Sequence, residues 1–138
     1  MRTLHVGLRV ADRERSLAFY AAVGYEVVGS VPETGLGHLT MLKLPGDDVV
    51  TVELVHDPTT DGIELGTGFS HLVVQVESLD DTVARLAASG IEAEEPVFPD
   101  GSADVRTTWI TDPDGRRIEL VQWPAGHAVG LTAVDWTV

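Results

Sequence analysis

The chain has 138 residues, a formal net charge of −13, a hydrophobic fraction of 43% and no cysteine. The length suits one domain or two small fused modules, and the hydrophobic fraction is enough for a packed core. The acidic charge disfavours nucleic-acid binding, the missing cysteines exclude disulfides and thiolate zinc sites, and no apolar stretch approaches the roughly 20 residues that cross a bilayer. Because the first residues also lack the apolar run of a signal peptide, a cytoplasmic protein without a membrane partner is expected.

The first half of the chain predicts a strand, a helix and three further strands. Residues 4–10 alternate apolar and polar side chains, which is the period of a half-buried strand. Asp12 can cap the helix that follows, and Gly24 suits its left-handed C-terminal cap. The apolar face of that helix holds Leu17, Tyr20 and Ala21. The three strands are expected at residues 25–31, 38–44 and 49–55.

The second half predicts the same order of elements. A strand at residues 71–76 precedes a helix that begins with a capping box at Ser78 and ends near Gly90. The apolar face of that helix holds Val83, Leu86 and Ala87. Strands are expected at residues 91–97, 105–111 and 117–122, the last one after the turn Asp112-Pro113-Asp114-Gly115.

A shift of 66 positions aligns the two halves without a gap. It places His5 on His71 and Glu53 on Glu119, so that 48 residues separate the His from the Glu in each half. A duplicated module follows, and we predict an α+β fold of two tandem βαβββ modules. The expected boundaries are 1–57 for the first module, 58–69 for a linker, 70–123 for the second module and 124–138 for a C-terminal tail. Trp123 and Trp136 are expected to cover apolar surface.

Strand parity predicts a metal site. His5 and Glu53 alternate with the apolar residues of their strands, so both lie on the sheet face turned away from the helix, and His71 with Glu119 repeats the pattern. A carboxylate in an apolar strand is costly unless it is paired or binds a metal. Two imidazoles and two carboxylates suit a divalent ion such as Zn, Ni, Co, Mn or Fe(II). The remaining histidines, which have no counterpart in the repeat, are assigned structural roles: His38, His56 and His127.

Three segments resemble a known family. Leu4-His5-Val6-Gly7-Leu8-Arg9-Val10, Glu64-Leu65-Gly66-Thr67-Gly68-Phe69-Ser70-His71 and the segment from Asp112 to Leu120 resemble the glyoxalase I family of the vicinal oxygen chelate superfamily. The resemblance runs from about residue 1 to residue 122. It implies cupped mixed sheets around one divalent metal per site (Ni, Co, Zn or Mn), and a homodimer.

The resemblance also implies an activity and residue roles. Family members convert the hemithioacetal of methylglyoxal and a low-molecular-weight thiol, usually glutathione, into a lactoyl thioester through an enediolate. His5, Glu53, His71 and Glu119 match the metal ligands. Glu119 matches the principal base, and Glu53 its partner for the other substrate enantiomer. Arg9 matches an arginine that holds a glutathione carboxylate.

Two features of the sequence depart from the pattern of the glyoxalase I family. Asp57 stands where the family commonly has an asparagine that contacts the thiol, and the loop that usually binds the thiol's other carboxylate is acidic here, with only Arg106 nearby.

Three alternative functions remain open. One alternative is an acyl-CoA epimerase or related isomerase, which typically carries an amide in place of Glu53. Another is an extradiol dioxygenase, which needs only two His and one Glu. The last is an antibiotic-binding resistance protein, which generally lacks the ligands.

Overall fold

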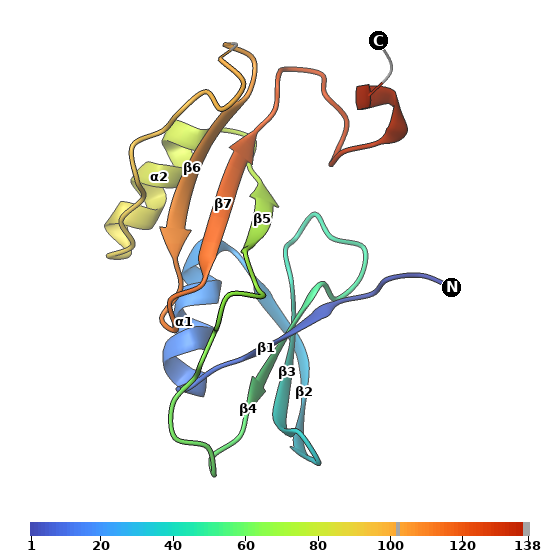
Figure 1. Ribbon diagram of the computed structural model, residues 1–138, viewed down its shortest axis with the longest axis vertical. Helices are drawn as coiled ribbons and strands as arrows, with labels where there is room; N and C mark the ends of the chain where they lie inside the picture. Colours follow the sequence, from blue (N-terminus) through green and yellow to red (C-terminus); the bar gives the residue numbers. More distant parts are fainter. Residues whose placement is uncertain (102, 137–138) are drawn as a thin grey trace. The chain divides into compact units, whose positions relative to one another are not determined.

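The computed structural model describes residues 1–101 and 103–136. It contains two mixed β-sheets and two α-helices (Figure 1). The elements in chain order are β1 (Val6–Arg9), α1 (Arg13–Val23), β2 (Glu26–Thr34), β3 (Gly37–Lys43), β4 (Val52–His56), β5 (His71–Gln75), α2 (Leu79–Ala88), β6 (Arg106–Thr111), β7 (Arg117–Gln122) and the 3₁₀ turn η1 (Ala133–Trp136). The strand orders are β1-β4-β3-β2 and β5-β7-β6. β1 runs parallel to β4, and β5 runs parallel to β7, while the other pairs are antiparallel. The predicted α+β class is confirmed.

The chain divides into two compact units. The first holds Met1–Phe69 and Asp112–Gly115, and the second holds Ser70–Thr111 and the residues from Arg116 onward. The turn that precedes β7 therefore belongs to the first unit. There the buried hydroxyl of Tyr20 donates to Asp112 Oδ2 at 2.7 Å, and the amide of Ala11 donates to Asp114 Oδ1 at 3.2 Å. These bonds hold the turn against the residues that precede α1 and against the C-terminal half of α1.

Both helices begin where their capping residues predict. The side chain of Asp12 accepts from the amide of Arg15 at 3.0 Å, and Ser78 accepts from the amide of Asp81 at 3.3 Å. The chain leaves α1 through Gly24, whose φ of 130° is disfavoured for residues with a side chain. No helix among the described residues has the length and apolarity that a membrane span requires.

Each sheet buries one face against its own helix. In the first unit Leu8, Val52 and Leu54 are buried, and α1 contacts β4. In the second unit Ile118 and Leu120 are buried, and α2 contacts β6 and β7. The expected helical faces are only partly right: Tyr20 and Leu86 are buried, but Ala21 and Ala87 are exposed. Small alanine side chains carry little apolar area, so their burial is weakly enforced.

The strand expected at residues 91–97 is absent from the second sheet, and this prediction is wrong. The segment makes one isolated bridge, Val97 with Thr107, and the amide of Glu94 donates to the carbonyl of Trp109 at 2.9 Å. Pro96 has no N–H to donate to a ladder, and the acidic residues beside it have low strand propensity. Residues 91–97 therefore follow the edge of β6 without forming a regular strand.

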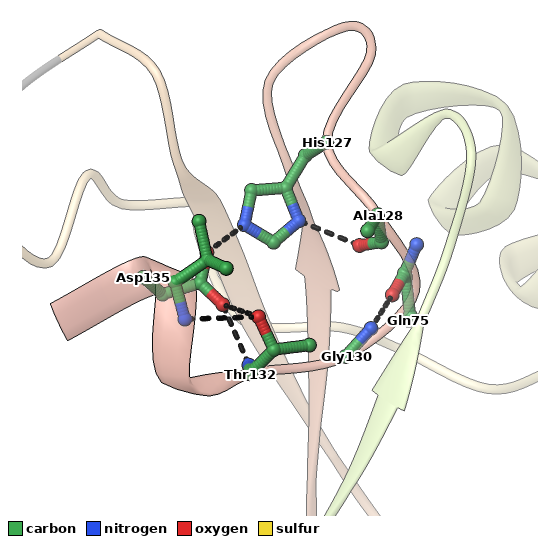
Figure 2. A network of polar contacts seen from close by, with 7 residues as sticks. Gln75, His127, Ala128, Gly130, Thr132 and Asp135 are labelled. Atoms are coloured by element: carbon green, nitrogen blue, oxygen red, sulfur yellow. Dashed lines mark hydrogen bonds and ion pairs between the residues drawn. The ribbon is translucent and has the colours of Figure 1, made fainter. Parts of the chain in front are cut away.

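The C-terminal tail is held by a network around His127 (Figure 2). The ring nitrogen Nε2 lies 2.8 Å from Asp135 Oδ1, and Nδ1 lies 2.6 Å from the carbonyl of Ala128. The other carboxylate oxygen of Asp135 accepts from the amide and hydroxyl of Thr132. These bonds, the Thr132 amide first, and the charge of His127 hold the pKa of Asp135 below its ordinary value.

The two tryptophans of the tail differ in their surroundings. The Trp123 ring stacks on His127, with ring centroids 4.8 Å apart and an interplanar angle of 19°. Trp136, in contrast, is 72% exposed, so the expectation that it covers apolar surface is wrong. The tail is attached to β5 by a hydrogen bond from the amide of Gly130 to Gln75 Oε1 at 3.0 Å (Figure 2).

Candidate metal centre

The first pair of predicted ligands meets in the first unit. His5 immediately precedes β1, and Glu53 lies on β4 opposite Gly7. Their side chains converge, with His5 Nε2 3.1 Å from Glu53 Oε2, and 13% of the Glu53 side chain is exposed. A Cβ atom at Gly7 would lie 3.8 Å from Glu53 Oε1, so the missing side chain leaves open space beside this carboxylate.

The second pair repeats this geometry in the second unit. His71 begins β5, and Glu119 lies on β7 opposite Val73. His71 Nε2 is 3.5 Å from Glu119 Oε2, and 21% of the Glu119 side chain is exposed. In both units the Glu is therefore opposite the residue two positions after the His. The parity argument holds locally, since the neighbours of Glu119, Ile118 and Leu120, are buried on the other face.

The donor chemistry of each pair fits a divalent metal. Two ligands that bind one ion at about 2.1 Å and at right angles lie roughly 3 Å apart, which is close to the separations in both pairs. Ser70 Oγ lies 2.8 Å from His71 Nδ1, so this bond orients the ring and leaves Nε2 toward Glu119. Within residues 1–101 and 103–136 no group of three or more potential ligands is close enough to hold one ion. Each pair, termed a half-site, offers one imidazole nitrogen and one carboxylate oxygen.

Two residues that the sequence analysis missed lie beside the second pair. The ring of Trp109 on β6 meets the ring of His71 edge-on, with centroids 5.1 Å apart. The guanidinium carbon of Arg117 lies 4.7 Å from the Trp109 centroid, and its Nη2 lies 2.9 Å from Glu94 Oε1. Parity would have identified Arg117, because it precedes Glu119 by two positions on the same strand.

Arg9 and Asp57, the candidate thiol contacts of the first unit, lie near the ends of neighbouring strands. The Asp57 carboxylate accepts from the hydroxyl of Thr59 at 2.7 Å and from its amide at 2.9 Å. These bonds lower the pKa of Asp57, and the positive charge of Arg9 acts in the same direction. Asp57 is therefore an anion that offsets part of the charge of Arg9.

Arg106, the remaining candidate, is placed away from the second pair. Its guanidinium forms a two-point ion pair with Asp80, at 2.9 and 3.1 Å, which raises the pKa of Arg106 and lowers that of Asp80. Arg106 is opposite Gln122, whose Oε1 accepts from the first amide of α2. Arg106 consequently lies on the helix side of its sheet, and the structure does not bring it to His71 and Glu119.

Comparison with known proteins identifies relatives over nearly the whole chain. Residues 2–120 match the family described as Glyoxalase/Bleomycin resistance protein/Dioxygenase superfamily. The sequence is 31% identical over 132 residues to a lactoylglutathione lyase of Neisseria meningitidis serogroup A, which covers 91% of this chain and 94% of the relative. A lactoylglutathione lyase of Escherichia coli O157:H7 is 28% identical over 134 residues, which covers 94% of this chain and 99% of the relative.

Solved structures show the same fold at lower identity. A trypanothione-dependent glyoxalase I of Leishmania major superposes with a TM-score of 0.72 at 24% identity, over 88% of this chain and 86% of its own. An antibiotic-binding protein of Streptomyces sp. CB03234 superposes with a TM-score of 0.68 at 23% identity, over 89% of this chain and 97% of its own. Proteins with different functions thus share this architecture, and only the site distinguishes them.

Proposed function

Because this chain belongs to the Glyoxalase/Bleomycin resistance protein/Dioxygenase superfamily, we propose that it is a metal-dependent lyase of the glyoxalase I type. Its reaction converts the hemithioacetal of a 2-oxoaldehyde and a thiol into a 2-hydroxyacyl thioester. The observation that carries this proposal is the presence of two matched His–Glu pairs, at 3.1 and 3.5 Å. Relatives named lactoylglutathione lyase, which match more than nine-tenths of this chain, support it.

We assign His5, Glu53, His71 and Glu119 as ligands of one divalent ion, Ni, Co, Zn or Mn. Such an ion supplies a Lewis acid that stabilises negative charge on the substrate oxygens. We further propose a homodimer with two such sites, as the resemblance to the glyoxalase I family implies. Sedimentation of the metal-loaded protein as a monomer would contradict the dimer.

The chemical step that the protein's residues perform is a proton transfer between adjacent carbons. Glu119 takes the proton from the carbon that bears the sulfur and the hydroxyl group and returns it to the neighbouring carbonyl carbon. The hydroxyl proton passes to the former carbonyl oxygen, which leaves a thioester beside a secondary alcohol. No electron acceptor is needed, because one carbon is oxidised as the other is reduced. Glu53 has the matching position in the other half of the repeat and is assigned the same role for the opposite enantiomer.

The binding-protein alternative is disfavoured by the same pairs. A protein that only sequesters an apolar drug gains nothing from two half-buried carboxylates, each of which costs free energy to desolvate. The fold it shares with an antibiotic-binding protein at 23% identity does not bear on activity.

A spectrophotometric panel tests the proposed reaction. Hemithioacetals of methylglyoxal with several low-molecular-weight thiols are mixed with protein loaded with Ni, Co, Mn or Zn, and thioester formation is followed. Metal-dependent turnover of at least one pair is expected. If no combination is turned over by protein that holds stoichiometric metal, the proposed activity is wrong.

Glutathione is expected to be a poor cosubstrate, and Asp57→Asn is expected to improve turnover of the glutathione hemithioacetal. Asp57 is an anion beside Arg9, so it weakens the cation that would hold a glutathione carboxylate, and the chain's charge of −13 adds repulsion. Removing one exposed charge should raise kcat/KM for the glutathione hemithioacetal by about threefold.

The neutral thiol 2-mercaptoethanol serves as the control cosubstrate, since its kcat/KM should not change. Asp61→Asn removes an exposed charge from the neighbouring linker and should leave both cosubstrates unaffected. A wild-type enzyme that is already efficient with glutathione, and gains nothing from Asp57→Asn, would contradict this electrostatic explanation.

A further inference from the structure

Arg117 shares a sheet face with the second metal-ligand pair. It is directly opposite His71 in the β5–β7 register and precedes Glu119 by two residues on β7, so all three side chains leave the sheet on the same side. Among the described residues of β5, β6 and β7, it is the one Arg or Lys on that side, because Arg106 faces the helix. A single guanidinium therefore stands next to the half-site.

The guanidinium of Arg117 is held in place from two directions. It lies 4.7 Å from the centroid of the Trp109 ring, within the range of a cation–π contact, and its Nη2 contacts Glu94 at 2.9 Å. Trp109 in turn contacts the ring of ligand His71. Arg117 is 45% exposed, and a guanidinium has five N–H donors, so one ion pair does not exhaust its capacity to bind a carboxylate.

The repeat has no counterpart of this arrangement in the first unit. Thr51 precedes Glu53 by two residues, as Arg117 precedes Glu119, and Met41 is opposite Glu53, as Trp109 is opposite Glu119. The His–Glu pairs are duplicated, but a cation two residues before the Glu and a large aromatic ring opposite the Glu are not; the first unit carries its cation, Arg9, on β1 instead, opposite Val55. Metal binding would require similar pairs in both units, whereas cations at different positions relative to the two pairs are what recognition of an asymmetric substrate requires.

We propose that Arg117 is a specificity-determining residue that binds a carboxylate of the substrate, with Glu94 as an internal partner that the carboxylate displaces. A chain of net charge −13 repels anions, so a substrate carboxylate needs a local cation, and a planar guanidinium matches the two oxygens of a carboxylate. The identity of the substrate rests on the proposed function. Because Arg117 is in register with a metal ligand, the carboxylate is placed on the acyl half of the hemithioacetal, not on the thiol.

Binding of malonate tests the role of Arg117 without turnover. Calorimetry compares wild type, Arg117→Gln, Arg117→Lys and Glu94→Gln at matched metal content, so that binding to the metal cancels between the samples. Arg117→Gln should weaken malonate binding about tenfold, Arg117→Lys less, and Glu94→Gln should strengthen it about threefold. Arg85→Gln, an exposed change on α2, is the control and should bind like wild type. Equal affinities in all variants, or no binding to the wild type, would overturn the proposal.

Four hemithioacetals test whether the carboxylate that Arg117 binds belongs to the acyl half of the substrate or to the thiol. They combine methylglyoxal, or a 2-oxoaldehyde with a carboxylate on its alkyl chain, with neutral 2-mercaptoethanol or anionic 3-mercaptopropionate. Arg117→Gln is expected to raise KM about tenfold for the carboxylated oxoaldehyde while kcat changes little. If KM rises instead for the hemithioacetals of the anionic thiol, the assignment of the carboxylate to the acyl half is overturned. If nothing is turned over, the proposed function fails, and the malonate series still decides whether Arg117 binds carboxylates.

Discussion

Replacement of Glu119 by Gln is expected to lower kcat for the best hemithioacetal by about 10²–10⁴-fold, the usual cost of losing a general base. Glutamine keeps the size of the side chain and an oxygen that can remain near His71, but its neutral amide cannot accept the substrate proton at any accessible pH. The measurement is kcat for the wild type and the variant after metal content has been matched.

Two further variants show whether the loss of turnover is specific to Glu119. Glu33→Gln changes an exposed carboxylate on β2 and should keep full turnover. Glu53→Gln should lower turnover less than Glu119→Gln when one substrate enantiomer is supplied, because Glu119 is assigned as the principal base. Undiminished turnover by a metal-replete Glu119→Gln enzyme would exclude the role of Glu119 as the base.

The strands that carry the site could be predicted because their burial alternates. In β4, Val52 and Leu54 are buried while Glu53 between them is only partly covered, and β7 repeats the pattern around Glu119. A period of two is the direct consequence of strand geometry, so the sequence alone assigns the Glu side chains to a face. The same interval of 48 residues in both halves then predicts that each His lies beside its Glu.

Elements whose stability depends on distant partners were harder to predict. Residues 91–97 contain enough apolar side chains to suggest a strand, but Pro96 and the acidic residues around it leave only a bridge to Thr107. The conformation of the tail depends on His127 and Asp135, which are eight residues apart and show no periodic pattern. The periodic patterns used to predict helices and strands do not predict such contacts.

The surroundings of the half-sites were also only partly predictable. In β6, Thr107 and Thr108 are both buried, so alternation cannot reveal which side of the sheet Arg106 occupies. Trp109 comes close to His71 only through the register of β6 on β7, which depends on the length of the turn between them. The candidate metal ligands could thus be named from the sequence, and parity could also have identified Arg117, whereas the position of Trp109 beside His71 required the structure.

Loss of one histidine from either half-site is expected to abolish stoichiometric metal binding. His5→Ala and His71→Ala each remove one of four proposed ligands and leave a carboxylate without its imidazole partner, so both the number and the type of donors become unfavourable for Ni, Co, Zn or Mn. Metal content, measured by mass spectrometry on folded protein, should fall from about one ion per proposed site to a small fraction of that. Turnover should fall with it.

The matched control for metal binding is His127→Ala, which removes a histidine from the tail network and leaves both His–Glu pairs intact. This variant should hold as much metal as the wild type, even though the tail loses its contact with Asp135. If only His71→Ala loses metal, the ion is bound by the second pair with solvent, and the first pair is no part of the centre. Full metal content in both His5→Ala and His71→Ala would mean that the ion is held elsewhere, because a site of four ligands cannot lose an imidazole from either half without a large fall in affinity.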